Sequence, residues 1–557
     1  MILRGGGFSH LVFHLVGKIG IASLLAGITL LLVMPLVSLM LPWLDAFSGN
    51  NTGLPVLLQM WQTVLPSYAM DTALLCTMVA FTAGIMGTTS AVLVTLFNFR
   101  GRGILEWALL LPLAMPAYVV AYAYTDFLQF SGGLQTWMRS SFGLHGALLP
   151  EIRSIGGAAL VFSFCLSPYV YLLVRTALSE RAGHLMEAAR LLGSPLHERI
   201  VRVALPLARP AIAAGVALVL METLADFGVV SYFGVQTFSA GIFKAWLAMD
   251  NRVAAAQLAT VLLVVVAILL KIEQSSQAKI RFAANKGARA AAGQTTAMAL
   301  SGASALVAQI LCAIPVLLGF VMPVLLMLYT LGVQSQSQDV VMPWAAFFQW
   351  SSNSLRLAAL TAVLAVGCGL LLTFLTRIYA SKWLAVVTRL ASLGYAVPGT
   401  VIVVGLLLPL AWFQDKFPEL RIGYWLTATS AGLIWAYLVR FNAVTVQTLQ
   451  SGYSRIPKSL DESSRMLGAS KFELLRTVHA PLLKRSVITA ALLVFVDVMK
   501  ELPATLVLRP FNSDTLAVVT YQLARDERLG EAALPALALV LVGLVPVIML
   551  SSSLRRR

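Results

Sequence analysis

Carboxylates placed inside apolar segments are the side chains of this sequence best suited to chemistry. Glu222 and Asp226 stand four residues apart in one apolar segment, and Asp497 and Glu501 stand four apart in another. The second pair lies 275 positions after the first (497 minus 222, and 501 minus 226). A spacing of four places both members of a pair on one helical face. Because ionisable groups inside a membrane are costly and mark substrate or ion paths, we predict a cation-favouring substrate path.

These carboxylates also have a structural interpretation, in which they pair with one another or with backbone groups freed at helix breaks. Lys500 lies in the same segment as the second pair and is expected to neutralise one of the charges. Gly228 and Pro503 follow the two pairs at the same offset of 275. Helix interruptions at equivalent places in two repeats point to a central site in transporters.

Two tyrosines add oxygen atoms to the predicted path. Tyr118 and Tyr122 share one helical face within the segment 115–126. Phenolate and carboxylate oxygens suit a hard cation such as Fe³⁺. Aromatic packing in an interfacial belt is the alternative explanation for the two rings, so no firm metal site follows from them.

Composition indicates what must position these residues. The chain has 557 residues, of which 59% are hydrophobic and only 11% charged. A soluble protein of this length could not cover its apolar surface with so few charges, so we predict an integral membrane protein. The formal net charge is +16, but most Lys and Arg residues fall between apolar runs, where they set topology rather than bind nucleic acid.

The remaining metal-binding residue types show no pattern of a site. The four cysteines lie inside apolar runs without paired spacing, which predicts neither disulfides nor a metal centre; they are Cys76, Cys165, Cys312 and Cys368. Three histidines fall in polar segments and are expected at the surface; they are His184, His197 and His479.

Apolar runs long enough to cross about 30 Å of hydrocarbon form two sets of six. The predicted fold class is therefore an all-α integral membrane protein with about 12 transmembrane helices in two parallel six-helix repeats. Residues 1–272 and 299–557 form the two membrane domains, and the polar segment 273–298 is a flexible cytoplasmic linker. The runs lie near 19–44, 70–98, 104–126, 155–178, 208–233, 253–271, 300–332, 355–376, 390–412, 424–446, 482–508 and 532–553.

The distribution of charge predicts an orientation for these spans. Arg and Lys residues gather in the segments that would be cytoplasmic if the N-terminus is cytoplasmic, which also places the C-terminus there. The first apolar run is longer than a signal-peptide core, so we expect it to be an uncleaved first span.

Two long loops, about 180–210 and 455–485, occupy the same place in each half and repeat one pattern. The residues of the first copy are Glu187, Ala188, Ala189, Gly193, Leu205 and Pro206, and those of the second are Glu462, Ser463, Ser464, Gly468 and Pro481. The glutamates, glycines and final prolines again differ by 275. Three points at one offset indicate a duplicated functional unit.

Each loop is predicted to fold as an elbow of helix, turn and helix. Residues 185–192 and 460–467 form the first helices, each ended by a glycine in the left-handed conformation. The second helices begin at Ser194-Pro195, as N-cap and first helical residue, and at a capping box, Ser470 with Glu473. The final prolines are expected to end these helices before the next span.

The loops resemble the EAA motif of the permeases of ABC importers. The second copy departs from that motif, because Ser463 and Ser464 replace two alanines and Ala480 replaces a leucine. The resemblance implies that each elbow docks on a separate ATPase and transmits closure of the ATPase dimer. The chain lacks a G-x-x-x-x-G-K-[ST] sequence, so we expect ATP and Mg²⁺ on that partner, no cofactor on this chain, and no enzyme activity of its own.

Other segments resemble the fused ferric iron permeases; they are 111–122, 500–505 and 515–521. This resemblance implies a bacterial inner-membrane protein that moves Fe³⁺ by alternating access, with a periplasmic substrate-binding protein and a homodimeric ATPase as partners. Thiamine or another small solute is the alternative substrate. A secondary transporter with two six-span repeats is the alternative of a different class, but it needs no duplicated elbow.

Overall fold

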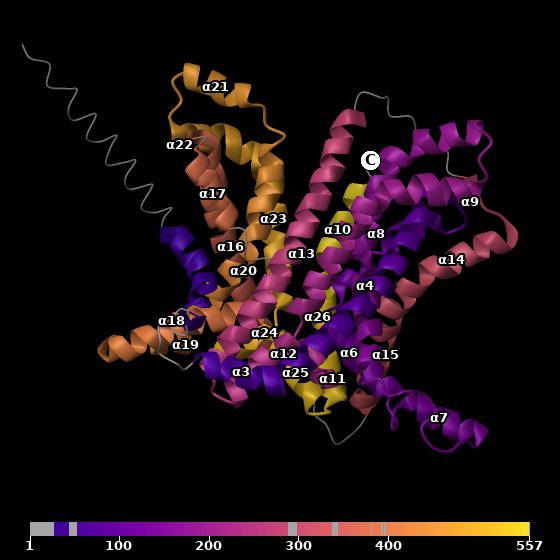
Figure 1. The fold of residues 1–557 in the computed structure, drawn as a ribbon, viewed down its shortest axis with the longest axis horizontal. Coiled ribbons are helices and arrows are strands. Elements are labelled where there is room, and N and C mark those ends of the chain that lie inside the picture. Colours follow the sequence, from indigo (N-terminus) through magenta and orange to yellow (C-terminus); the bar gives the residue numbers. More distant parts are fainter. Residues whose placement is uncertain are drawn as a thin grey trace, which may run out of the picture.

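The computed structural model of this chain describes residues 27–43, 53–287, 298–336, 344–379, 381–391, 394 and 397–555. Helices make up nearly all of this part. Its one sheet is a parallel pairing of two short strands, β1 (Phe97–Asn98) with β2 (Met298–Ala299), in which Phe97 lies opposite Met298. The predicted all-α class is therefore confirmed (Figure 1).

Eight helices of the described residues are long and apolar enough to cross a membrane, and ten spans result if two bent pairs each count as one. Of the other two predicted spans, 19–44 is described only from residue 27 to 43, and this part holds a short apolar helix, Gly27–Ser38. The second is α23 (Ala480–Lys500), which is too rich in charged residues to count as apolar. Two of its charges, Asp497 and Lys500, face a cavity described below.

Four helices form the centre of the first half: α4 (Leu65–Leu96), α8 (Ile155–Leu191), α10 (Leu205–Ala225) and α13 (Arg252–Gly287). Three helices form the centre of the second half: α16 (Trp344–Tyr379), α20 (Ala431–Tyr453) and α23. Glycines allow close approach at equivalent crossings. A Cβ on Gly87 of α4 would lie 2.6 Å from Val170 Cβ of α8, and one on Gly369 of α16 would lie 2.4 Å from Thr445 Cγ2 of α20. Small residues at such crossings let helices pack without polar contacts.

The third predicted span is bent rather than straight. It consists of α5 (Arg102–Ala108), the short 3-10 segment η1 (Leu111–Ala114) and α6 (Ala117–Leu128), with α7 (Gly133–Phe142) beyond, and its two parts meet at 91°. Pro116 sits directly before α6 with extended backbone angles. Proline suits the start of a helix and disfavours helical angles at the residue before it, so the chain turns here, after the carbonyls that end η1.

The first part of the predicted linker is helical rather than flexible. Helix α13 runs without interruption to Gly287, so residues 273–287 continue the sixth span of the first half. Ala, Gln, Lys and Arg in this segment are good helix formers, and extending an existing helix requires no new nucleation. The rest of the predicted linker up to residue 297 lies outside the described residues.

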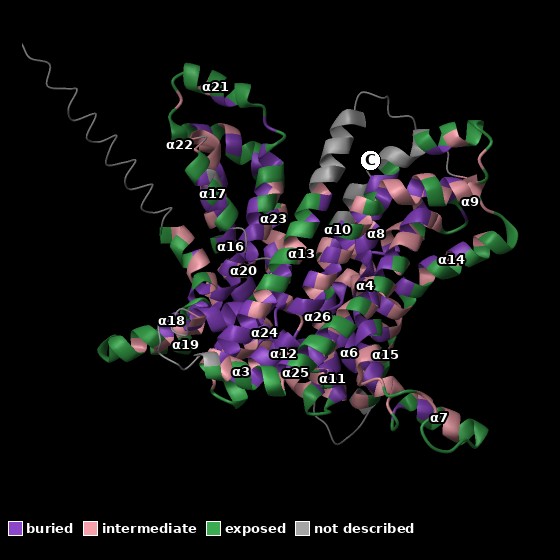
Figure 2. Cartoon of the chain, in the orientation of Figure 1, coloured by how far each residue is buried: buried purple, intermediate pink, exposed green. Residues whose placement is uncertain are grey.

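The remaining helices are divided between the two ends of the molecule (Figure 1). At one end lie α9 (Leu196–Glu198), α21 (Lys458–Met466) and α22 (Lys471–Glu473). At the other end lie α11 (Gly228–Phe233), α12 (Phe238–Phe243), α24 (Pro503–Leu508) and α25 (Leu516–Arg525). Figure 2 shows that the first group is largely exposed, whereas much of the second group is buried. Both predicted elbows therefore lie at one end of the fold.

Candidate functional site

The turn of each elbow has the conformation expected from its glycine. Gly193 has φ +81° and Gly468 has φ +85°, the left-handed region that favours glycine at a helix end. The backbone N–H group of each glycine closes the same turn in both copies. Gly193 donates to Arg190 O at 3.0 Å, and Gly468 donates to Arg465 O at 3.0 Å.

The first helices of the two elbows differ from the prediction and from each other. In the first elbow no separate short helix precedes Gly193, because span four continues as α8 to Leu191. In the second elbow α20 ends at Tyr453, and α21 forms a separate helix. Pro457 precedes α21 in an extended conformation, and proline restricts the residue before it to non-helical angles, which explains the break.

The final prolines do not end the second helices, contrary to expectation. Pro206 and Pro481 lie in the first turns of α10 and α23, which run on into the membrane. A π-helical segment precedes each proline: η2 (Arg199–Ala204) and η7 (Leu474–His479). The wider turn accommodates a ring that would otherwise clash with the carbonyl four residues earlier.

The helix starts were predicted with mixed success. Ser470 and Glu473 form the predicted capping box, with Ser470 N donating to Glu473 Oε2 at 2.7 Å and Glu473 N donating to Ser470 Oγ at 3.2 Å. Pro195, not Ser194, stands at the N-cap of α9, and no side chain caps that helix.

The motif residues at the tips of the elbows are open to solvent (Figure 2). Glu187 and Glu462 are exposed, as are Ala188 and Ser463, while Ala189 and Ser464 are half-buried. Sequence reasoning missed the apolar residues beside them. Leu191 and Leu192 are 85% and 86% exposed, and their counterparts Met466 and Leu467 are 90% and 88% exposed. Large apolar side chains held in water by a rigid turn indicate a surface for a protein partner.

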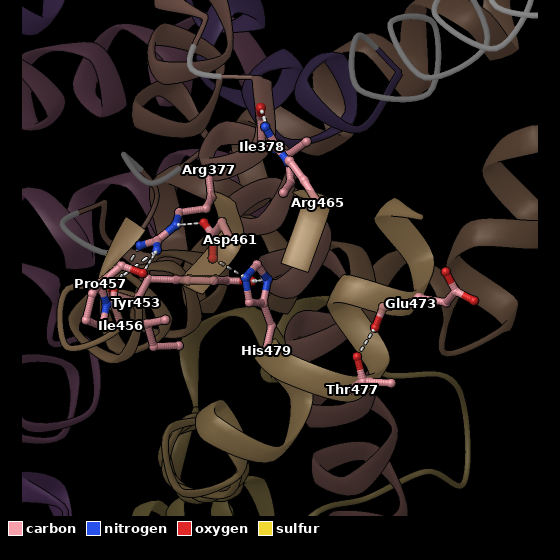
Figure 3. A network of polar contacts seen from close by, with 10 residues as sticks. All are labelled: Arg377, Ile378, Tyr453, Ile456, Pro457, Asp461, Arg465, Glu473, Thr477 and His479. Carbon is pink, nitrogen blue, oxygen red and sulfur yellow. Dashed lines mark hydrogen bonds and ion pairs between the residues drawn. The ribbon is translucent and has the colours of Figure 1, made fainter. Parts of the chain in front are cut away.

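A buried polar network holds the second elbow to the membrane helices (Figure 3). Arg377 at the end of α16 donates from Nε to Asp461 Oδ2 at 2.7 Å. It also donates to the carbonyls of Tyr453 at 3.1 Å and Ile456 at 2.9 Å. His479 lies with Nε2 2.9 Å from Asp461 Oδ1 on the other side. Asp461 thus joins α16, α21 and η7.

His479 was expected at the surface and is instead fully buried. Its ring packs at 5.7 Å from Phe374 and at 5.2 Å from Tyr453 between ring centroids. The matching positions of the first elbow, 275 residues earlier, are Met186 and Ala204, which are both buried. The first elbow is therefore anchored by apolar packing where the second uses an ion pair.

A cavity of about 210 Å³ lies at the breaks that follow α10 and α23. All four predicted carboxylates line it. Asp226 ends α10 with φ −74° and ψ 134°, and Glu501 ends α23 with φ −68° and ψ 127°. The two repeats are therefore interrupted at equivalent residues, as predicted. Tyr118 also lines the cavity, but Tyr122 does not and donates instead to Met327 Sδ at 3.1 Å.

Two of the four carboxylates accept hydrogen bonds from backbone N–H groups. Asp226 Oδ1 accepts from Val229 N at 2.8 Å, at the start of α11. Glu501 accepts from Ala504 N at 2.9 Å and from Thr505 N at 3.0 Å, at the start of α24. These contacts satisfy N–H groups that a helix start leaves without partners. Asp226 and Glu501 therefore have the backbone partners that the structural interpretation expects.

Glu501 also has an ion-pair partner, Arg440, that the sequence analysis did not identify. Arg440 Nη1 donates to Glu501 Oε1 at 3.1 Å, and its side chain lines the cavity. The sequence analysis did not single out Arg440, which lies in the middle of α20. A lone arginine within a long apolar run was the signal that could have identified it.

Glu222 and Asp497 are different, because neither has a hydrogen-bond or ion-pair partner among the described residues. The Tyr118 hydroxyl beside them is also buried without a hydrogen-bond partner in this part of the chain. Lys500 lines the same cavity and donates from Nζ to Leu113 O at 3.0 Å. The described residues hold no group of three or more His, Cys, Asp or Glu side chains arranged to hold a metal ion.

A second cavity, of about 580 Å³, lies on the side away from the elbows, between α11, α12, α24 and α25. Phe227 lines both cavities. Its ring centroid lies 4.2 Å from that of Phe243 and 5.9 Å from that of Tyr521. An aromatic cluster therefore separates the two spaces.

The comparisons with known proteins agree with this arrangement. The family model "binding-protein-dependent transport system inner membrane component" matches residues 81–273 and 365–556, one match in each half. The chain belongs to this family. Its two repeats are thus two copies of the membrane domain of ABC importers. Proteins of this family are multi-pass inner-membrane transport subunits, and they work with a substrate-binding protein and an ATPase.

Individual relatives differ in what they transport. An Fe(3+)-transport system permease of Haemophilus influenzae is 27% identical over 94% of this chain and 97% of its own length. A probable ABC transporter permease of Sinorhizobium fredii is 26% identical over 98% of this chain and 96% of its own length. A sulfate transport system permease of Escherichia coli is 27% identical over 31% of this chain and 62% of its own length.

Proposed function

We propose that this chain is the permease of a ferric iron importer, which moves Fe³⁺ from a periplasmic binding protein to the cytoplasm by alternating access. The observation that carries this proposal is the pair of elbows at one end of the fold, each with an exposed apolar tip. Two equivalent tips suit two equivalent subunits of a homodimeric ATPase.

Each elbow has two parts with separate roles in this proposal. The exposed tip, with the glutamate and the two apolar residues before the glycine, docks in a cleft of an ATPase subunit. The helix after the glycine transmits the movement, because it continues through η2 into α10, or through η7 into α23. The coupling residues are Glu187, Ala188, Ala189, Gly193, Leu205, Pro206, Glu462, Ser463, Ser464, Gly468 and Pro481.

The same two helices end at the central cavity, which connects the coupling surface to the substrate path. Both α10 and α23 begin at an elbow and stop at a cavity carboxylate, Asp226 or Glu501. Closure of the ATPase dimer would draw the elbows together and shift both helix ends at once. This rearrangement opens the central cavity to the outer cavity, and ATP hydrolysis restores the starting state.

Iron as substrate is supported by the similarity to the Fe(3+)-transport permease along nearly the whole chain. It is also supported by a path lined with carboxylates and the phenol of Tyr118, since hard cations prefer oxygen. The elbow end is the cytoplasmic side, and both chain termini are cytoplasmic. The chain binds no cofactor, and ATP with Mg²⁺ binds the partner.

Uptake of ⁵⁵Fe³⁺ into proteoliposomes tests the proposal. The vesicles hold this chain with its co-purifying ATPase, the binding protein is added outside, and ATP is enclosed or omitted. ATP-dependent accumulation of iron is the expected result. Coupled ATP hydrolysis without iron uptake would overturn the substrate, and thiamine would be the next solute to test. Uptake that ignores ATP and vanadate would overturn the class in favour of a secondary transporter.

A further inference from the structure

The central cavity contains a charge arrangement that specifies the kind of solute it passes. Its four carboxylates and two cations divide into three groups. Glu501 is paired with Arg440 and with the start of α24, and Asp226 is bound to the start of α11. Glu222 and Asp497 remain, one from each repeat at the same offset, together with the Lys500 ammonium.

Lys500 is held away from the two open carboxylates by a fitted niche. Its ammonium donates to Leu113 O at the carbonyl end of η1, 3.0 Å away, where the partial negative charge of a helix end favours a cation. Gly543 of α26 (Leu529–Arg555) forms the opposite wall. A Cβ at this glycine would lie 2.7 Å from Lys500 Cε and 2.8 Å from Nζ. The niche therefore exists only because residue 543 lacks a side chain.

The unpartnered hydroxyl of Tyr118 shows that the cavity is a site and not merely an acidic cluster. This oxygen is buried and bonded to nothing among the described residues, on a side chain that is 5% exposed. A buried polar group without a partner is destabilising, so a solute or its water is expected to bond to it during transport. Two open carboxylates and one phenol offer oxygen atoms alone.

The geometry points to a cavity that passes a cationic solute by charge exchange, in which Lys500 is the resident counter-ion of Glu222 and Asp497. When a cation arrives, the two carboxylates act on it and the ammonium stays on the Leu113 carbonyl. After the cation leaves, the ammonium is still on the Leu113 carbonyl and compensates the two carboxylates across the cavity, without an ion pair to either. Because no three-ligand metal group exists among the described residues, the cation passes with its own shell of water or chelator.

This inference rests on the proposed import function but does not depend on iron. Thiamine is also a cation and would satisfy it, whereas sulfate, the substrate named for one relative, would be repelled by the two open carboxylates. Charge, rather than a fitted binding pocket, is what distinguishes the two classes here, since like charges in a low-dielectric site repel strongly.

Single and double variants that change the charge of Lys500 and Asp497, assayed for uptake into the proteoliposomes, test this arrangement. Glu222, Asp497 and Lys500 together carry a charge of −1; Lys500→Met changes this charge to −2 and Asp497→Asn changes it to 0, so each is expected to lower ATP-driven uptake of the cation about tenfold or more. The double variant Lys500→Met with Asp497→Asn restores the balance and is expected to recover most of the loss. A purely structural role for either residue would give losses that add instead, and that result would overturn the inference.

Two controls separate this inference from the proposed function. Co-purification of the ATPase is expected to be unchanged in all three variants, because the elbows lie at the far end of α10 and α23. Asp415→Asn changes an exposed carboxylate outside the cavity and is expected to leave uptake unchanged. Uptake of sulfate in place of a cation by the wild-type chain would overturn the inference while leaving the importer itself intact.

Discussion

His479 and Asp461 lie 2.9 Å apart inside the second elbow, with Arg377 bonded to the other oxygen of the same carboxylate. The corresponding pair in the first elbow, Ala204 and Met186, is apolar. The two elbows therefore share a backbone turn but differ in how they are attached. Equal ATPase subunits would pull on unequal attachments, and the second is the one that a single charge change can loosen.

Replacing Asp461 with Asn tests this attachment. Removing one partner of a buried ion pair leaves the other charge uncompensated and typically costs about 3 kcal/mol. We expect faster hydrogen–deuterium exchange in residues 458–467 and weaker coupling of ATP hydrolysis to uptake. Glu462→Gln, on the same helix but exposed, is the matched control for local stability. Equal exchange in both variants would show that the network does not hold the elbow.

The same network predicts a dependence on pH. Burial alone would raise the pKa of Asp461, but hydrogen bonds from Arg377 and His479 outweigh it and hold this pKa below its usual value. A lowered pKa in the folded state contributes stability above the unfolded value of about 3.9, and this contribution is lost as pH falls through the folded pKa. Protection of residues 458–467 is therefore expected to persist from neutral pH to about pH 4 and to fall below it.

Glu473 titrates in the same range and needs its own control. The backbone N–H of Ser470 bonded to its carboxylate holds the pKa of Glu473 below its usual value. Glu473→Gln removes that group and keeps the Asp461 network. If the acid loss of protection disappears in Glu473→Gln but persists in Asp461→Asn, the capping box and not the ion pair is responsible.

Much of this architecture could be predicted from sequence because it repeats. The offset of 275 joined Gly193 with Gly468 and Glu222 with Asp497, and a left-handed glycine or a helix break is a local property. The burial of His479 and the pairing of Arg440 with Glu501 could not be predicted, since both depend on which helix packs alongside. The roles of the four carboxylates likewise became distinct only when the backbone N–H groups of α11 and α24 had been placed.

The apolar tips are expected to supply much of the affinity for the ATPase. Leu192→Asp or Leu467→Asp places a charge on a surface that must lose water on docking, and losing such an anchor typically costs 2 kcal/mol or more, or about thirtyfold in affinity. Phe511→Asp is the control, because Phe511 is fully exposed in the loop between α24 and α25, away from the elbows. Titration of the purified ATPase against each variant measures the effect. Equal losses in all three would indicate a general surface effect.

Packing between α16 and α20 depends on the absence of one side chain. Gly369→Ala would bring a Cβ to 2.4 Å from Thr445 Cγ2, whereas Gly367→Ala, on the same helix, would meet nothing within 4 Å. Overpacking at a tight crossing costs about 1–3 kcal/mol, so Gly369→Ala is expected to lower the thermal midpoint in detergent. Gly367→Ala is expected to match or exceed the wild-type midpoint, since alanine favours helix over glycine. A lower midpoint for Gly367→Ala alone would contradict this account of the crossing.

Phe227 is expected to be the barrier between the two cavities. It follows the break in α10, lines both spaces and stacks on Phe243. Its counterpart at the same offset, Leu502, lines the central cavity from the second repeat. Phe227→Ala removes the ring from this cluster and would join the cavities without any movement of the elbows. We therefore expect ion leakage through proteoliposomes in the absence of ATP, measured as loss of an imposed membrane potential.

Phe233→Ala deletes a buried ring from the other end of the same short helix and is expected to keep the vesicles tight. Tight vesicles with Phe227→Ala would place the barrier elsewhere in the path.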